Sequence, residues 1–249
     1  NERAFILFGL GLSHKPKSFI EMYANASQNY RSVTFSDISI VNPAYSINPN
    51  IQDENWLSFD LGIRGNANNL LSYDVNLFGL LYNNRIGFIQ KAFPEGYVKS
   101  ERGNVGDAVM FGLESVFEVN LKKVLRLSDK YMLNYVLNSS FIDSQYIRSE
   151  EAGVVGNDVE FIPNWNIKTS CSFGYIDWMI NVQYTYLSSQ FTDATNAIES
   201  NLSGVIGKIP SYSVLDFSCQ YSFNQFKLEA GINNILDTHY FTRRATGYP

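Results

Sequence analysis

Two neighbouring stretches near the carboxyl-terminal third of the chain alternate strictly between apolar and polar residues. In IDWMINVQYTYL, residues 176–187, Trp178, Val182 and Tyr184 fall on one face, whereas Asn181 and Gln183 fall on the other. NWNIKTSCSFGY, residues 164–175, repeats this pattern. Successive side chains of a strand point to opposite faces, so a period of two predicts strands with one apolar and one polar face.

The same alternation recurs along most of the chain. It is found at 57–64, 111–120, 131–138, 215–223 and 226–233, and in weaker form at 4–14, 18–30 and 72–85. We therefore predict about ten strands. They run for about ten to fourteen residues, longer than the globular mean of about five to six and long enough for tilted strands that cross a bilayer.

The predicted connections alternate between short and long. Short or moderate connections lie at 14–18, 64–72, 121–130, 175–177 and 224–226, and long polar ones at 31–54, 86–108, 146–163 and 189–211. Alternate connections of an up-and-down sheet lie at the same end. All long loops are therefore expected at one end of the sheet and all turns at the other, as in outer-membrane barrels.

The composition of the polar face separates a membrane barrel from a soluble sandwich. It carries Asn, Ser, Gln, Asp, Glu and Lys, which suit a wet or filled lumen but not a dry core. Aromatic residues gather towards strand ends on the apolar face, as in an interfacial girdle. We therefore predict an all-β fold: an antiparallel transmembrane β-barrel portion with long extracellular loops and short periplasmic turns. A soluble sandwich would instead hide Trp178, Val182 and Phe217 against an opposing sheet.

Charge and cysteine content exclude several other classes. The net charge is −5, charged residues make up 17% of the chain, and no basic stripe is present, which argues against nucleic acid as a partner. Cys171 and Cys219 form no CxxC or Cys/His cluster, so no metal site or disulfide framework is expected. An enzyme is not expected either, because His14 falls in a short turn at the wrong end and His239 lacks a GxSxG partner.

Three motifs resemble those of TonB-dependent outer-membrane receptors. LEAGINNILDTHYFTRRATGYP, residues 228–249, resembles the Gly-x-x-Asn-Leu/Ile-x-Asp-x-x-Tyr run of the penultimate barrel strand in that family. EMYANASQNYRSVTFSDI, residues 21–38, resembles its Tyr-x-Asn-x-Ser-x-x-Tyr/Phe-Arg strand and loop. NPNIQDENWLSFDLGIRG, residues 48–65, resembles its descending strand, with Asp53-Glu54 where Pro-Glu is commoner and Asp60 in place of Glu. The ending is most similar to the ferric-citrate branch.

The resemblance implies a particular domain organisation. The family folds as a 22-stranded barrel filled by an amino-terminal plug. Residues 1–249 would then be the carboxyl-terminal part of the barrel, about strands 12 to 21, with the plug domain and the first half of the barrel absent.

The resemblance also implies a function in the bacterial outer membrane. It implies active import of a metal chelate, ferric citrate or another ferric siderophore, with the ferric chelate as cargo and no resident cofactor. The expected partners are TonB with its inner-membrane energising complex, engaged through the plug, and the outer-membrane lipid. A passive diffusion porin is the alternative, but it leaves the closing motif unexplained.

Capture of an anionic chelate needs arginine or lysine at the loop end, because guanidinium groups bind carboxylates in a bidentate manner. The expected ligand-binding residues are Arg31, Arg85, Arg102, Arg243 and Arg244, with Arg148 as a further candidate. A lone loop arginine is more often only solvated. The adjacent pair Arg243 and Arg244 is favoured because neighbouring like charges are costly without an anion nearby. Asn233, Asn234, Tyr240 and Phe241 are expected to have structural roles.

Overall fold

The structure, a computed structural model, describes residues 6–40, 42–94, 96–200 and 204–244. These residues form one β-sheet and two four-residue helices. The elements in chain order are β1 (Gly9–Lys17), β2 (Ile20–Arg31), α1 (Phe35–Ile38), β3 (Tyr45–Ile47), β4 (Glu54–Ala67), β5 (Leu71–Ala92), β6 (Val98–Asn120), α2 (Leu121–Val124), β7 (Tyr131–Arg148), β8 (Trp165–Tyr175), β9 (Trp178–Leu187), β10 (Tyr212–Phe223) and β11 (Phe226–Ile232). No helix within these ranges is long and apolar enough to cross a membrane.

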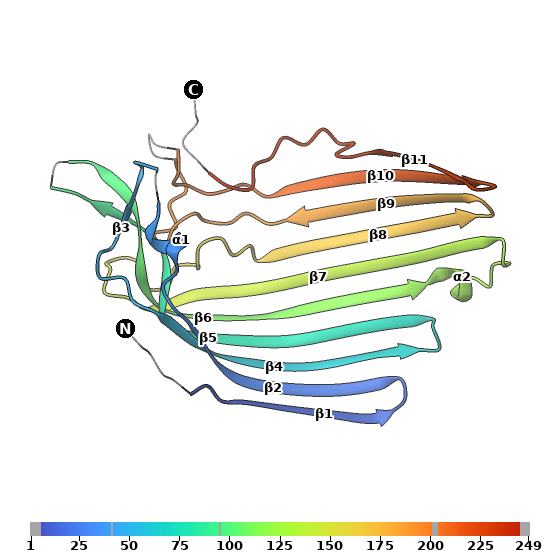
Figure 1. Cartoon of the computed structure of the whole chain (residues 1–249), viewed down its shortest axis with the longest axis horizontal. Coiled ribbons are helices and arrows are strands. Elements are labelled where there is room, and N and C mark those ends of the chain that lie inside the picture. The colour runs from blue at the N-terminus through green and yellow to red at the C-terminus, as the bar shows by residue number, and fades with distance from the viewer. Residues whose placement is uncertain (1–5, 41, 95, 201–203, 245–249) are drawn as a thin grey trace.

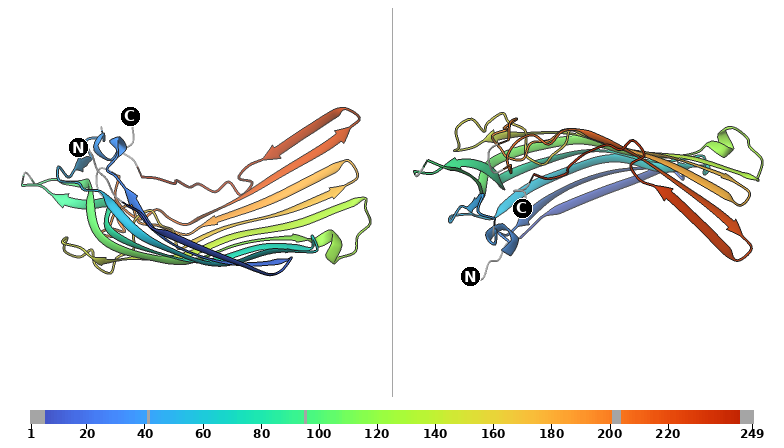
Figure 2. Two further views of the ribbon diagram at one scale, coloured as in Figure 1. Left: turned by 60° about the horizontal axis from the view of Figure 1, so that its bottom comes forward. Right: turned by 90° about the horizontal axis from the view of Figure 1, so that it is seen from above.

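Ten strands follow one another across the sheet in sequence order, each antiparallel to the next, and β3 alone pairs in parallel, with β6. Figure 1 shows the turns gathered at one end of the strands and the long connections at the other, which confirms the predicted asymmetry. The sheet is a curved trough, with β1 and β11 as its two edges (Figure 2). This single layer excludes the soluble sandwich.

Cross-strand register confirms the predicted faces. Val182 lies opposite Cys171 on β8 and Phe217 on β10, and Trp178 lies opposite Tyr175 and Tyr221. Directly paired residues share a face, so the apolar positions of neighbouring strands merge into one continuous belt. Trp178 and Val182 are 51% and 38% exposed, because no second sheet covers them.

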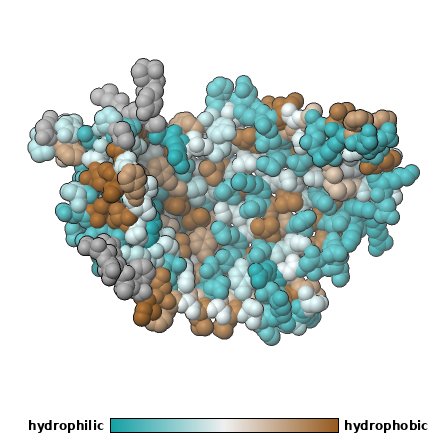
Figure 3. Space-filling model, viewed as in Figure 1, coloured by the Kyte–Doolittle hydropathy of each residue, from teal (hydrophilic) through white to brown (hydrophobic). Residues whose placement is uncertain are grey.

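The opposite, concave face carries the polar residues. Tyr23 of β2 donates a hydrogen bond to Asp74 of β5, across β4 (2.9 Å). Ser172 of β8 donates one to Asn181 of the neighbouring strand β9 (2.9 Å). Figure 3 looks into this side, and the strand region there is mostly hydrophilic or neutral. The hydrogen bonds satisfy polar groups that a barrel would enclose.

The strand boundaries differ most from the prediction in two regions. The first strand, expected over 4–14, runs from Gly9 to Lys17, so His14 lies in β1 opposite Met22 and not in a turn; residues 4 and 5 lie outside the described residues. The connection expected as a loop over 86–108 is a hairpin in which β5 and β6 extend far past their neighbours. Bulges beside Asn84 (φ 56°) and Gly106 (φ 157°) interrupt the alternation there, so a period-two pattern does not reveal these parts of the strands.

Candidate ligand-binding site

The extended β5–β6 hairpin organises the loop end of the sheet. Beyond the bulges the free edge of β6 pairs with β3, where Asn48 donates its backbone N–H to the Arg102 carbonyl (2.8 Å). The free edge of β5 receives the β9–β10 connection, where Ala194 donates its N–H to the Phe88 carbonyl (2.8 Å). β3 comes from the β4 side of the sheet and Ala194 from the β7 side, so the hairpin has twisted until its edges have exchanged sides.

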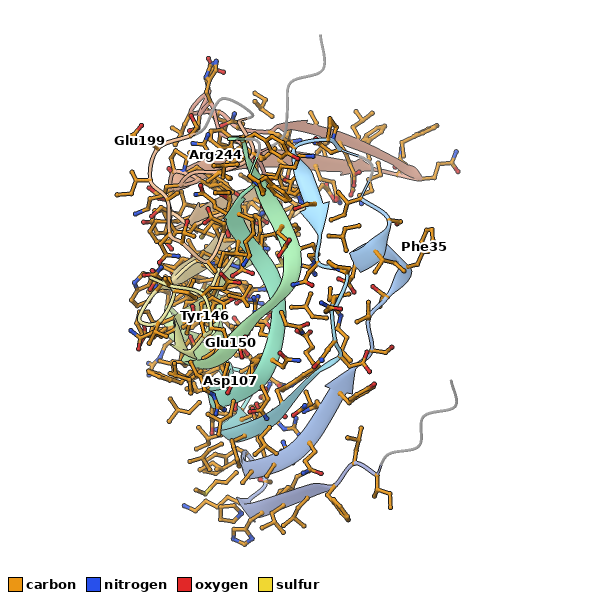
Figure 4. The ribbon with its side chains drawn as sticks, turned by 90° about the vertical axis from the view of Figure 1, so that its left-hand side faces the viewer. Phe35, Asp107, Tyr146, Glu150, Glu199 and Arg244 are labelled. Atoms are coloured by element: carbon orange, nitrogen blue, oxygen red, sulfur yellow. The ribbon has the colours of Figure 1, made fainter. Side chains whose placement is uncertain are left out.

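Connections from both sides of the sheet are therefore held on one element. In Figure 4, which faces the loop end, Phe35 of α1 and Tyr146 lie on opposite sides of the hairpin. A small apolar core supports the contact between hairpin and loops. It consists of Ile89, Val105, Ala108, Met110, Tyr146, Val154, Val159 and Ala194.

A buried polar triad lies beside this core. Arg85 donates hydrogen bonds to Glu160 (2.8 Å) and to the Tyr146 hydroxyl (3.0 Å), and that hydroxyl donates to the other oxygen of Glu160 (2.8 Å). Glu160 also accepts the Phe88 backbone N–H (3.2 Å). The Glu160 side chain is only 2% exposed and that of Arg85 15%. Arg85, an expected ligand-binding residue, thus has a buried carboxylate as its partner.

Gly87 makes room for this triad. A Cβ at position 87 would lie 2.2 Å from Glu160 Oε1 and 2.9 Å from a Val105 methyl group. We expect Gly87→Ala to cost about 1–3 kcal/mol in the free energy of unfolding, as overpacking of a tight site usually does. Thermal unfolding of the full-length protein checks this. Gly79→Ala is the control, because nothing lies within 4 Å of a Cβ there, and equal melting temperatures for the two variants would contradict the prediction.

A second ion-pair cluster ties the β2–β4 connection to the hairpin. Asp37 of α1 accepts hydrogen bonds from Arg31 (2.7 Å) and Arg102 (2.8 Å), and Arg31 also pairs with Glu54 (2.9 Å). The Arg102 guanidinium lies over the Phe88 ring, 4.7 Å from its centre. Two expected ligand-binding residues, Arg31 and Arg102, are thus held by one buried aspartate.

Asp37 stays ionised in this setting. Burial of its carboxyl opposes ionisation, but hydrogen bonds from Thr34, Arg102 and Arg31 outweigh it and lower the pKa below the ordinary value of 3.8. A lowered pKa in the folded state means that this tie contributes stability above about pH 4 and loses it as the pH falls further. The cluster is therefore intact at neutral pH.

Arg148 lies at the rim of a polar cavity of about 470 Å³. Its guanidinium pairs with Asp107, and its side chain is 79% exposed. The cavity walls are mostly carboxamides and acids: Asn48, Asn50, Gln52, Asn84, Asn104, Asp107, Glu150 and Glu151. This cavity offers hydrogen-bond acceptors and little net positive charge.

Lys208, Arg243 and Arg244 differ from the arginines described above, because none of them forms an ion pair with a described carboxylate. Arg244 donates two hydrogen bonds to the Lys208 carbonyl (2.9 and 3.3 Å) and lies over the Phe241 ring (5.2 Å). Lys208 lies over the Phe191 ring (5.0 Å), and Arg243 is exposed. In the part of the chain that the structure describes, no carboxylate forms an ion pair with these three side chains. Lys208 interacts electrostatically with Asp158, whereas the charge of Arg243 and Arg244 is available at the loop end.

The closing motif forms a turn and not a continuous strand. β11 ends at Ile232, and Asn234 (φ 53°) accepts the Thr238 backbone N–H (3.0 Å) and donates to the Thr238 carbonyl (3.1 Å). Asp216 of β10 accepts the Asn234 backbone N–H (2.8 Å). Tyr240 then stacks on Tyr212 with ring centres 4.3 Å apart. The expected structural roles of Asn234 and Tyr240 are confirmed, but the motif interrupts the strand because Asn234 adopts a positive φ and its side chain closes a turn onto Thr238.

The chain matches the family "TonB dependent receptor-like, beta-barrel" over residues 1–235. It belongs to the TonB-dependent receptor β-barrel family. Solved receptors share its fold. The unliganded ferric citrate transporter FecA is 20% identical with a TM-score of 0.75, and the match covers 98% of this chain and 36% of FecA.

Two further receptors show the breadth of this likeness. The siderophore receptor PiuA from Acinetobacter baumannii is 20% identical with a TM-score of 0.70, covering 97% of this chain and 33% of PiuA. The ferric yersiniabactin uptake receptor FyuA from Yersinia pestis is 17% identical with a TM-score of 0.68, covering 94% and 33%. The chain thus spans about a third of the length of these receptors, and at these identities the likeness establishes the shared barrel fold.

Sequence reasoning missed three site residues of this TonB-dependent receptor barrel. Asp37 and Glu160 are the buried partners of the expected arginines, and Lys208 lies beside Arg244. Asp37 had a local signal, since Thr34 and Asp37 form a capping box at α1. Glu160 and Lys208 lie in loops without periodicity, so their partners could not be found from spacing.

Proposed function

We propose that this chain is the carboxyl-terminal barrel part of an outer-membrane receptor for TonB-dependent import of a metal chelate, ferric citrate or another ferric siderophore. Family membership supports the receptor class, and FecA, PiuA and FyuA are named as transporters or receptors of such cargo. In this proposal TonB, its inner-membrane energising complex and a plug act on the barrel, and no covalent chemistry takes place.

The positive charge around Arg244 is the observation that favours an anionic cargo. Arg31, Arg85 and Arg102 are each engaged by a buried carboxylate, so an anion would have to displace that partner. Arg244 has the Lys208 carbonyl and the Phe241 ring as neighbours, which orient the cation without neutralising it. A chelate with peripheral carboxylates could bind there through charge-assisted hydrogen bonds.

Binding measurements on the full-length protein test this assignment. Replacing Arg243 and Arg244 by glutamine is expected to weaken the binding of ferric citrate at least about tenfold, since a hydrogen bond to a charged group contributes about 1.5–3 kcal/mol. Arg244→Lys is expected to recover part of the loss, because an ammonium group keeps the positive charge but cannot form the bidentate hydrogen bonds of a guanidinium group. Lys99→Gln, at the tip of the hairpin over Tyr97, is the control.

The binding measurements use three probes: ferric citrate, an uncharged ferric siderophore and iron-free citrate. Equal affinity of wild type and the double variant for every probe would contradict the role of Arg243 and Arg244. Uptake that persists without TonB, together with swelling of liposomes that contain the protein, would favour the passive porin instead.

A further inference from the structure

One connection at the turn end differs from its neighbours in length, charge and shape. The other four connections at this end, 18–19, 68–70, 176–177 and 224–225, are two or three residues long. Residues 121–130, LKKVLRLSDK, form a longer connection that begins with α2; we refer to it as the basic turn. It carries four basic residues, Lys122, Lys123, Arg126 and Lys130, and one acidic residue, Asp129.

Hydrogen bonds hold the basic turn in a defined conformation. The Asn120 side chain caps α2 by accepting the Lys123 backbone N–H (3.1 Å), and Leu125 donates its own N–H to the Leu121 carbonyl (2.9 Å). Arg126 adopts a φ of 54°, which ends the helix with a left-handed residue. The Lys123 ammonium donates to the Asn68 carbonyl of the neighbouring turn (3.2 Å). The positions of the exposed side chains are thereby held.

The basic turn exposes apolar and basic side chains together. Val124 is 48% exposed and Leu125 58%. Lys122 pairs with Asp129 (2.7 Å), whereas Arg126 and Lys130, both exposed, form no ion pair with any carboxylate of the described chain. An exposed apolar surface that is bordered by unpaired cations has the composition of an interfacial membrane segment.

Its location matches that composition. Both views of Figure 2 show α2 projecting on the convex side of the trough, the side of the apolar belt, and not into the concave side. The next residue after the turn is Tyr131, whose ring lies 4.9 Å from that of Tyr175. Trp178 and Tyr221 continue this aromatic row, with ring centres 4.6 Å apart. The basic turn is therefore continuous with the aromatic boundary of the lipid-facing belt, where head groups lie.

We propose that the basic turn is a docking site for anionic phospholipid head groups in the leaflet at the turn end of the barrel, with Arg126 and Lys130 binding the phosphate and Leu125 inserting beside the acyl chains. This rests on the proposed outer-membrane function. Charge complementarity selects an anionic lipid over a zwitterionic one, because Arg126 and Lys130 have no internal counter-charge. The capped helix reduces the entropy that ordering this segment on the membrane would cost.

Lipid binding by the full-length protein tests the proposal. The protein is reconstituted in nanodiscs of phosphatidylethanolamine with or without about a fifth of phosphatidylglycerol, and co-purified lipid is counted by mass spectrometry. Each basic side chain near an anionic surface is worth about a fivefold preference. Arg126→Gln with Lys130→Gln is therefore expected to lower the ratio of bound phosphatidylglycerol to bound phosphatidylethanolamine, taken relative to the same ratio in the bulk lipid, about 25-fold. Lys91→Gln with Lys99→Gln removes the same charge from the β5–β6 hairpin at the loop end and should leave this ratio unchanged.

The outcomes separate this proposal from the function on which it rests. Insertion into nanodiscs with equal enrichment in the two double variants would overturn the lipid site and leave the receptor proposal intact. Failure of the wild type to insert into any bilayer would overturn the receptor proposal itself. A photoreactive residue at Leu125 should crosslink to lipid, and a protein adduct in its place would show that a protein partner occupies the basic turn.

Discussion

The full-length protein with Val182→Arg is expected to be about 2–4 kcal/mol less stable in lipid than the wild type. Val182 lies within the apolar belt, opposite Cys171 and Phe217, and is 38% exposed on the convex side. An arginine there would place a guanidinium in hydrocarbon, where it cannot keep its hydration. Reversible folding into liposomes, followed by denaturant titration, measures the difference.

Gln183→Arg is the matched control, one residue away on the same strand. Gln183 lies opposite Ser170 and Asp216, so its side chain falls on the polar face. An arginine at this position is expected to change the stability by less than about 1 kcal/mol. Equal costs at positions 182 and 183 would mean that the two faces of β9 have been assigned to the wrong environments.

Glu160→Leu is expected to cost about 3–5 kcal/mol, because it leaves a buried guanidinium without its counter-charge. Arg85 would lose its carboxylate, Tyr146 the acceptor of its hydroxyl proton, and Phe88 the acceptor of its backbone N–H. The loss should be local, since the triad lies at the loop end of β5 and β7 and makes no contact with β9. Faster hydrogen exchange over 86–92 and 188–196 in the full-length protein, with unchanged exchange in β9, measures it.

An exposed ion pair supplies the control for this experiment. Glu21 pairs with Arg64 (3.0 Å) and Lys15 (3.3 Å), whose side chains are 52% and 67% exposed. Glu21→Leu is expected to leave hydrogen exchange over 86–92 as in the wild type, because water takes over the released cations. If Glu160→Leu left exchange over 86–92 as slow as in the wild type, Arg85 would be solvated in the variant and the triad would not hold the loops.

The alternation of apolar and polar residues determined the wall of this barrel on its own. Strand side chains change faces at every residue, so the period of two defines both the strands and the side of each that meets lipid. Residues 164–187 already specified the pairing of β8 with β9, because a one-residue slip would have moved Val182 off the apolar face. The motifs at 21–38, 48–65 and 228–249 determined the family for a related reason, since their turn and strand residues are local in the chain.

Only the tertiary structure decided the loop end. Arg85 and Glu160 are 75 positions apart in the chain, and Arg102 and Asp37 are 65 apart. No periodic pattern links residues at such separations. The bulges beside Asn84 and Gly106 twist the β5–β6 hairpin so that loops from opposite sides of the sheet meet on it. The charge of an arginine is visible in the sequence, but whether a carboxylate neutralises it depends on which loops the fold brings together.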